Sequence, residues 1–178
     1  MKIRKNDIFL YGRKMLFQML EILYPRRCAV CDEIEVTGKG ICPLCKDKVH
    51  VAGEPACKKC GKPLVDERKE FCTDCGKKHH VYTQGKAVFV YEGGIRNSMY
   101  RFKYGNKREY AEFYANAAVE KYGVWLNKIK AEVLIPIPMY SRKKRLRGYN
   151  QAEVFARELG RKAGILVDEH LVRRVRNT

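Results

Sequence analysis

The chain has 178 residues, which is enough for one ordinary domain and a smaller appendage but not for two large cores. Apolar residues make up 46% of the sequence and charged residues 32%, so a chain that is disordered throughout is excluded. The formal net charge of +17 favours a polyanionic partner, such as a nucleic acid, over a neutral one.

The first predicted element is an apolar and basic helix within residues 1–27. Apolar side chains recur at helical spacing between Met15 and Leu23, and Pro25 ends the pattern. We expect this helix to dock on the domains that follow, with a membrane-surface anchor or a partner-docking helix as alternatives. No stretch reaches the ~18 apolar residues of a membrane span. Since no small-residue cleavage site follows either, we expect a cytoplasmic protein without a transmembrane segment.

All the cysteines fall in residues 28–79, where they form four Cys-x-x-Cys pairs. Two such pairs complete a closed tetrahedral zinc site that leaves no position open for catalysis. A disulfide framework would instead indicate a secreted chain. The sequence therefore predicts a double zinc ribbon with two structural Zn²⁺ ions, held by Cys28, Cys31, Cys42, Cys45, Cys57, Cys60, Cys72 and Cys75.

The pairing of the knuckles is a separate question. We expect sequential ribbons rather than a cross-brace, because Gly61 and Gly76 directly follow the second cysteine of their knuckles and suit backbone with positive φ. Asp32 and Lys46 stand at the equivalent positions of the first ribbon, which predicts a looser ribbon there. His79 and His80 are expected at the surface or in the linker, since eight thiols already fill two sites.

Residues 80–178 show the order of an α/β domain with a parallel sheet. A strand is predicted over Lys86–Glu92, ended by Gly93 and Gly94. It is followed by helices over 95–104 and 109–128, a buried strand over 133–138, a basic loop over 139–147, a helix over 150–163 and a short final strand over 165–167.

The basic loop and the start of the helix after it combine cations, an aromatic ring and amides beyond the end of a predicted strand. Ligands of open α/β sheets bind at such ends, and these residue types suit a nucleic acid or a pyrophosphate. The candidate residues are Arg142, Lys143, Lys144, Arg145, Arg147, Tyr149, Asn150 and Gln151, with Lys103 and Tyr104 from a second basic-aromatic stretch. The alternatives are a solvated loop and an amphipathic helix whose cations extend to solvent.

These residues resemble the ComF family of competence-associated, phosphoribosyltransferase-like proteins. The resemblance rests on Leu-Tyr-Pro before the first knuckle, the knuckles themselves, Phe-Lys-Tyr-Gly at 102–105, Ile-Pro-Ile-Pro at 135–138 and Arg-Leu-Arg-Gly-Tyr-Asn-Gln at 145–151. It implies a double zinc ribbon followed by a type I phosphoribosyltransferase-like domain. It also implies binding of single-stranded DNA during its uptake, beside a helicase-like competence protein, with peripheral association at the inner face of the membrane.

The resemblance further implies an acidic pair and a Thr-Thr-Gly-type loop that cradle a ribose phosphate. Asp168 and Glu169 are followed by His170-Leu171-Val172 rather than by hydroxyls and glycine, so they do not form such a loop. We therefore expect an incomplete phosphoribosyltransferase-like domain, from a chain truncated at its C-terminus. An enzyme of this type that uses Mg²⁺, with its catalytic loop beyond the end of the chain, is the alternative to a DNA-binding protein.

Overall fold

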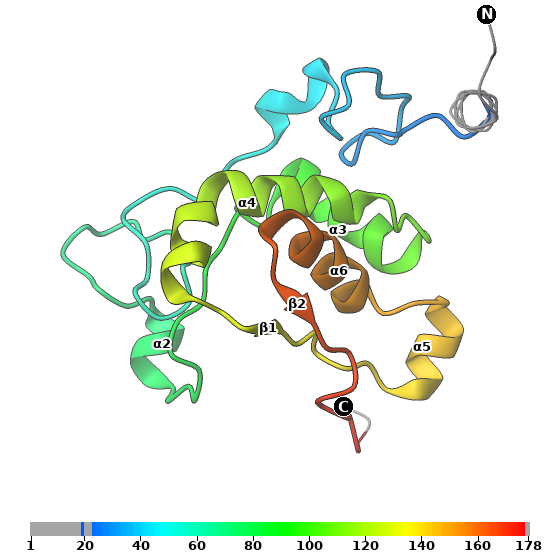
Figure 1. The fold of residues 1–178 in the computed structure, drawn as a ribbon. Coiled ribbons are helices and arrows are strands. Elements are labelled where there is room, and N and C mark those ends of the chain that lie inside the picture. Colours follow the sequence, from blue (N-terminus) through cyan, green and yellow to red (C-terminus); the bar gives the residue numbers. More distant parts are fainter. Residues whose placement is uncertain (1–18, 20–22, 177–178) are drawn as a thin grey trace, which may run out of the picture.

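Two cysteine-bearing segments precede a group of packed helices in the computed structural model, which describes residue 19 and residues 23–176 (Figure 1). Most of the predicted N-terminal helix lies outside the described residues. The elements are the 3₁₀ helix η1 (Pro43–Lys48), the helices α2 (Thr73–Lys77), α3 (Gly93–Tyr104), α4 (Tyr110–Ile129), α5 (Ser141–Arg147) and α6 (Gln151–Ala163), and the strands β1 (Val133–Leu134) and β2 (Leu166–Val167). None of the described helices is both long and apolar enough to cross a bilayer.

The packing of α4 against α6 is the most extensive contact between elements, and α3 adds a third helix to this group (Figure 1). Helix α3 buries Ile95, Ser98 and Phe102, which follow the three- and four-residue spacing of a helical face. The Ser98 hydroxyl lies 2.6 Å from the hydroxyl of Tyr114 on α4, so the one polar side chain on this face has a partner.

The start and end of α6 follow from its flanking residues. The Asn150 side chain accepts a hydrogen bond from the backbone N–H of Ala152 at 3.0 Å and so caps the first turn. Gly164 ends the helix with a φ of 69°, which suits glycine because it carries no Cβ. The predicted helix over 150–163 is therefore confirmed.

The sheet consists of two strands in the described part of the chain. β1 and β2 run parallel, with Val133 opposite Leu166 and Leu134 opposite Val167. Gly160 of α6 allows the helix to pack closely on β2, because a Cβ at this position would lie 2.5 Å from a methyl group of Val167. The predicted parallel pairing is confirmed, although the strand expected over 133–138 is limited to its first two residues.

The strand predicted over Lys86–Glu92 is wrong. This segment forms one isolated antiparallel bridge, between Phe89 and Val51, flanked by backbone hydrogen bonds to His50 and Ala52. It is extended, but it pairs with the linker between the two cysteine-bearing segments rather than with the sheet. Its Phe89 ring stacks on Phe113 of α4 at 5.4 Å between centroids, so the apolar side chains that suggested a strand are buried against a helix.

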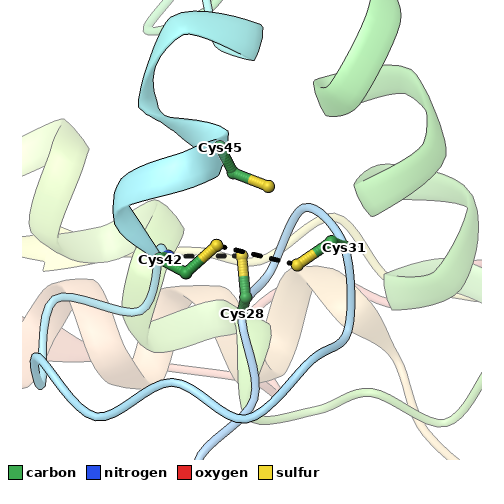
Figure 2. Close-up of side chains that lie close together, drawn as sticks. All are labelled: Cys28, Cys31, Cys42 and Cys45. Atoms are coloured by element: carbon green, nitrogen blue, oxygen red, sulfur yellow. Dashed lines mark hydrogen bonds between the residues drawn. The ribbon is translucent and has the colours of Figure 1, made fainter.

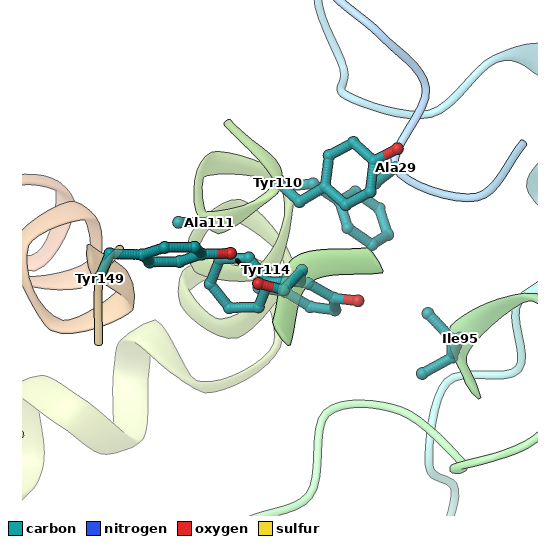
Figure 3. Close-up of a cluster of buried hydrophobic side chains, with 8 residues drawn as sticks. Ala29, Ile95, Tyr110, Ala111, Tyr114 and Tyr149 are labelled. Carbon is teal, nitrogen blue, oxygen red and sulfur yellow. Dashed lines mark hydrogen bonds between the residues drawn. The ribbon is translucent and has the colours of Figure 1, made fainter. Parts of the chain in front are cut away.

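The main core joins the first cysteine-bearing segment to the helices. Ala29, which lies between Cys28 and Cys31, is buried in the same cluster as Tyr110 and Tyr114 of α4 and Tyr149 before α6 (Figure 3). A second small cluster contains Cys28, Val30 and Cys45. The first ribbon therefore shares its core with the helices.

Candidate metal centres and basic surface

The first metal centre is formed by the loop around Cys28 and Cys31 and by the start of η1, which supplies Cys42 and Cys45 (Figure 2). Their sulfur atoms all lie within 4.8 Å of one another. Backbone N–H groups of Val30 and Cys42 each donate to Cys28 Sγ at 3.4 Å, as expected around a thiolate ligand.

The second metal centre repeats this arrangement with Cys57 and Cys60 from a loop and Cys72 and Cys75 from the start of α2. Zinc held at about 2.3 Å from four sulfurs in a tetrahedron places the sulfurs about 3.8 Å apart. The Sγ atoms of Cys31 and Cys42 are 3.7 Å apart, and those of Cys60 and Cys72 are 3.8 Å apart. Both groups fit Zn²⁺, and all eight cysteines are free thiols.

The sequential pairing of knuckles is thus confirmed. The expected role of the glycines is only half correct. Gly61 has a φ of 76°, but Gly76 lies within α2 and does not have a positive φ. In the first ribbon Asp32 occupies the position equivalent to Gly61 and adopts a φ of 70°. Each ribbon therefore has one loop knuckle with a left-handed residue and one knuckle that opens a helical turn.

The ionisation of the thiols differs within each centre. Burial opposes ionisation of Cys28, but backbone N–H groups that include those of Cys31 and Cys42 outweigh it and lower the pKa of this thiol to about 7. The same balance lowers the pKa of Cys57 to about 6. Burial and the neighbouring thiols raise the pKa of Cys45 and of Cys75 to about 12. In each centre the lowered pKa therefore favours the thiolate form of one loop cysteine, Cys28 or Cys57, which is the form in which cysteine would hold zinc.

His79 and His80 lie outside the four-sulfur groups, as expected. The His80 ring stacks on Tyr82 with 5.1 Å between centroids, and the Lys59 ammonium lies 5.2 Å from the same ring on the second ribbon. The groups that could hold a metal among the described residues contain cysteines alone.

The predicted basic loop is a helix. Ser141–Arg147 forms α5, which Gly148 ends with a φ of 83°. The signal was present in the sequence, because Arg, Lys and Leu are strong helix formers and a glycine after such a run is a common helix stop. Arg142, Lys143, Lys144 and Arg145 are exposed, and Figure 1 shows α5 at the edge of the fold, away from α2 and the second ribbon.

The end of α3 lies beside α5. The Arg147 guanidinium carbon is 4.7 Å from the centre of the Tyr104 ring, and the Tyr100 and Tyr104 rings are 5.1 Å apart. Tyr100, which belongs to the second basic-aromatic stretch but is not among the predicted site residues, is 65% exposed. Lys103 is half-buried on the same helix. The structure thus brings Tyr104 together with the cations of α5.

Tyr149 and Asn150 have structural positions instead of the surface positions expected of a binding site. Tyr149 is only 4% exposed, its hydroxyl donates to the Phe102 carbonyl, and the Arg108 guanidinium lies 4.9 Å from its ring. Asn150 is 1% exposed and donates to the Ile137 carbonyl at 3.0 Å while capping α6. Neither side chain is open to a ligand, because the fold encloses both.

Of Tyr149, Asn150 and Gln151, only Gln151 has a side chain that contacts a cation of α5. Its Oε1 accepts a hydrogen bond from Arg147 Nη1 at 2.5 Å. Sequence reasoning missed Arg108, which donates to the Gly148 carbonyl at 3.2 Å and so fixes the turn between α5 and α6.

Comparison with known proteins supports the metal centres. Residues 19–76 match the family model of the double zinc ribbon domain, a range that contains all four knuckles. No curated protein matches the chain, and no solved structure does. The cysteine-bearing part is therefore a double zinc ribbon domain with two four-cysteine sites suited to two structural zinc ions.

Proposed function

We propose that this zinc-containing protein binds single-stranded DNA through α5 and the adjoining end of α3. The observation that carries the proposal is α5 itself, a seven-residue helix with five cationic side chains, four of them exposed. Such a density of cations favours the phosphate backbone of a nucleic acid, because each phosphate contact releases bound counterions.

Acidic side chains neutralise little of this charge. Lys144 forms an ion pair with Glu153 at 2.7 Å. Arg142 and Arg145 form no ion pair with any residue between 23 and 176. These two arginines are the side chains that we expect to contact phosphates first.

The tyrosines beside α5 favour a single strand over a duplex. Tyr100 and Tyr104 are both more than 60% exposed, and the Arg147 guanidinium lies over the Tyr104 ring. Exposed rings next to cations suit bases that are free to stack, whereas the bases of a duplex are already stacked on each other.

A binding assay against salt concentration tests this function. A labelled single-stranded oligonucleotide should bind the wild-type protein with an affinity that falls steeply with salt, and Arg142→Ala/Arg145→Ala should reduce the log–log slope by about 0.7 per lost phosphate contact. Lys77→Ala/Lys78→Ala removes the same charge from the exposed end of α2 and serves as the control. Equal weakening by the two double variants would indicate diffuse attraction and refute the α5 site.

The resemblance to the ComF family supports a place for this binding in DNA uptake. We propose that the protein acts in the cytoplasm, at the inner face of the membrane, beside a helicase-like competence protein. Loss of the gene should lower the frequency of transformation, and a gene that encodes the Arg142→Ala/Arg145→Ala variant should fail to restore it. Full restoration by that variant would separate DNA uptake from the α5 surface.

A phosphoribosyltransferase-type enzyme is the second candidate, and one observation favours it. A cavity of about 560 Å³ lies beyond the carboxyl ends of β1 and β2, and its lining includes Lys144, Arg173 and Arg174. Titration with phosphoribosyl pyrophosphate and Mg²⁺ decides between the two functions. We expect no binding, because the sequence does not contain the acidic, Thr-Thr-Gly-type loop, and micromolar binding would favour the enzyme.

A further inference from the structure

A cavity of about 320 Å³ opens between α3, the start of α6 and the extended segment that precedes α3. Its volume is at the lower end of the range of about 300 to 1,000 Å³ for small-molecule sites. It has room for one ring system with part of its attached sugar, but not for a folded peptide. None of the predicted site residues except Gln151 lines it.

The walls of this cavity suit a flat ring. They include five aromatic side chains, from Phe89, Tyr91, Phe102, Tyr114 and Phe155. Several of these rings already contact one another at tilted or edge-on angles, for example Phe102 and Tyr114 at 5.5 Å between centroids. Aromatic walls favour an aromatic ligand over an aliphatic one, because stacked and edge-on ring contacts add to the gain from apolar burial.

One polar side chain at the cavity connects it to the basic surface. Gln151 lines the cavity, and its Oε1 accepts a hydrogen bond from Arg147. Within residues 23–176 its amide nitrogen has no hydrogen-bond partner, so its two N–H donors are available. Arg147 in turn belongs to α5 and lies over Tyr104. The side chain of Gln151 therefore connects the cavity, where a ring could bind, to Arg147, where a phosphate could bind.

We propose that the cavity receives one unpaired base of a DNA strand bound on α5. The base stacks among the aromatic walls and its edge accepts from the amide of Gln151, while a neighbouring phosphate lies on Arg147. This inference rests on the proposed function and deepens it, since it assigns a base-binding site to a surface proposed for its charge alone. Base capture costs unstacking, which is smallest for a single strand.

The test compares a thymidine oligonucleotide with an abasic sugar–phosphate oligomer of the same length. The wild-type protein should bind the thymidine strand about tenfold or more tightly, a difference typical of stacking on aromatic side chains. Ala152→Leu fills the cavity from its wall and should abolish this preference without changing the affinity for the abasic strand. Ala163→Leu makes the same change at the other end of α6, outside the cavity, and should retain the preference.

A fluorescent base gives a second readout that does not depend on affinity. A strand that contains 2-aminopurine should lose emission when the wild-type protein or Ala163→Leu binds it, and should keep its emission with Ala152→Leu. Thermal melting of each variant verifies that Ala152→Leu is folded. If Ala152→Leu retains both the preference and the quenching while Tyr104→Ala loses them, the bases stack on the exposed tyrosines and the cavity proposal is wrong.

The same data separate this inference from the function on which it rests. Equal affinities for the thymidine and abasic strands, both lowered by Arg142→Ala/Arg145→Ala, would leave DNA binding in place and overturn the base site. No binding of either strand would overturn both.

Discussion

The hydroxyl of Tyr110 at the start of α4 donates a hydrogen bond to Oδ1 of Asp32 in the first zinc knuckle, with 2.6 Å between the oxygens. Lys107 Nζ lies 2.8 Å from the same carboxylate oxygen. Burial opposes the charge on Asp32, but Lys107 and Tyr110 outweigh this and lower the pKa of its carboxyl group. The residue that replaces glycine in the first knuckle is thus held by two partners from the helical part, and the expectation of a looser first ribbon is not supported.

Tyr110→Phe should lower the free energy of unfolding by about 1.5 to 3 kcal/mol, because Asp32 loses one of its two partners and hydrogen bonds to charged groups contribute about this much. Urea denaturation in the presence of zinc measures the change. Tyr100→Phe removes a hydroxyl from an exposed ring on α3 and should leave the stability within about 0.5 kcal/mol of the wild type. Equal effects of both substitutions would show that the Asp32 contact contributes nothing.

The two glycines that follow zinc knuckles in the second ribbon should differ sharply in their tolerance of alanine. A Cβ at Gly61 would lie 2.7 Å from the backbone nitrogen of Ala87, and the φ of 76° adds strain, whereas a Cβ at Gly76 meets no atom within 4 Å. Gly61→Ala should destabilise the protein by about 1 to 3 kcal/mol. Gly76→Ala should be neutral or slightly stabilising, because it lies within a helix. Thermal melts of the Gly61→Ala and Gly76→Ala variants measure this difference, and similar melting temperatures for the two would contradict the prediction.

The protein should bind two zinc ions per chain, but the stability of the helices should depend on the first site only. Cys45→Ser and Cys72→Ser should each reduce the content to one ion by elemental analysis. Only Cys45→Ser should also lower the melting temperature of the helices, because Cys45 packs in a cluster with Cys28 and Val30 next to the shared core. Far-ultraviolet circular dichroism follows the helices. Identical melts would indicate that both ribbons are equally coupled to them.

Asn150→Ala should cost about 1 to 3 kcal/mol of stability, although the sequence suggests a ligand-binding role for this residue. The substitution removes the cap of α6 and leaves the Ile137 carbonyl without the Asn150 donor. Asn97→Ala on the exposed face of α3 is the matched control and should change stability by less than about 0.5 kcal/mol. If the Asn150→Ala protein is as stable as the wild type but binds DNA more weakly, the prediction is wrong and Asn150 belongs to the binding site.

The sequence was sufficient for features that depend on local spacing. Four Cys-x-x-Cys pairs determine two four-sulfur sites, because a tight knuckle brings its own two thiols together whatever surrounds it. The long helices and the glycine that ends α6 were predictable for the same reason, since caps and periodicity act within one or two turns.

Only the tertiary structure decided where each side chain of the basic segment lies. Tyr149 and Arg147 are two residues apart, yet the ring of Tyr149 is buried beside Phe102 in the main core while Arg147 lies over Tyr104. The extended segment around Phe89 likewise has the pattern of a strand, but its partner is the linker near Val51. Burial and pairing between distant residues depend on which elements meet in space, and local periodicity carries no information about that choice.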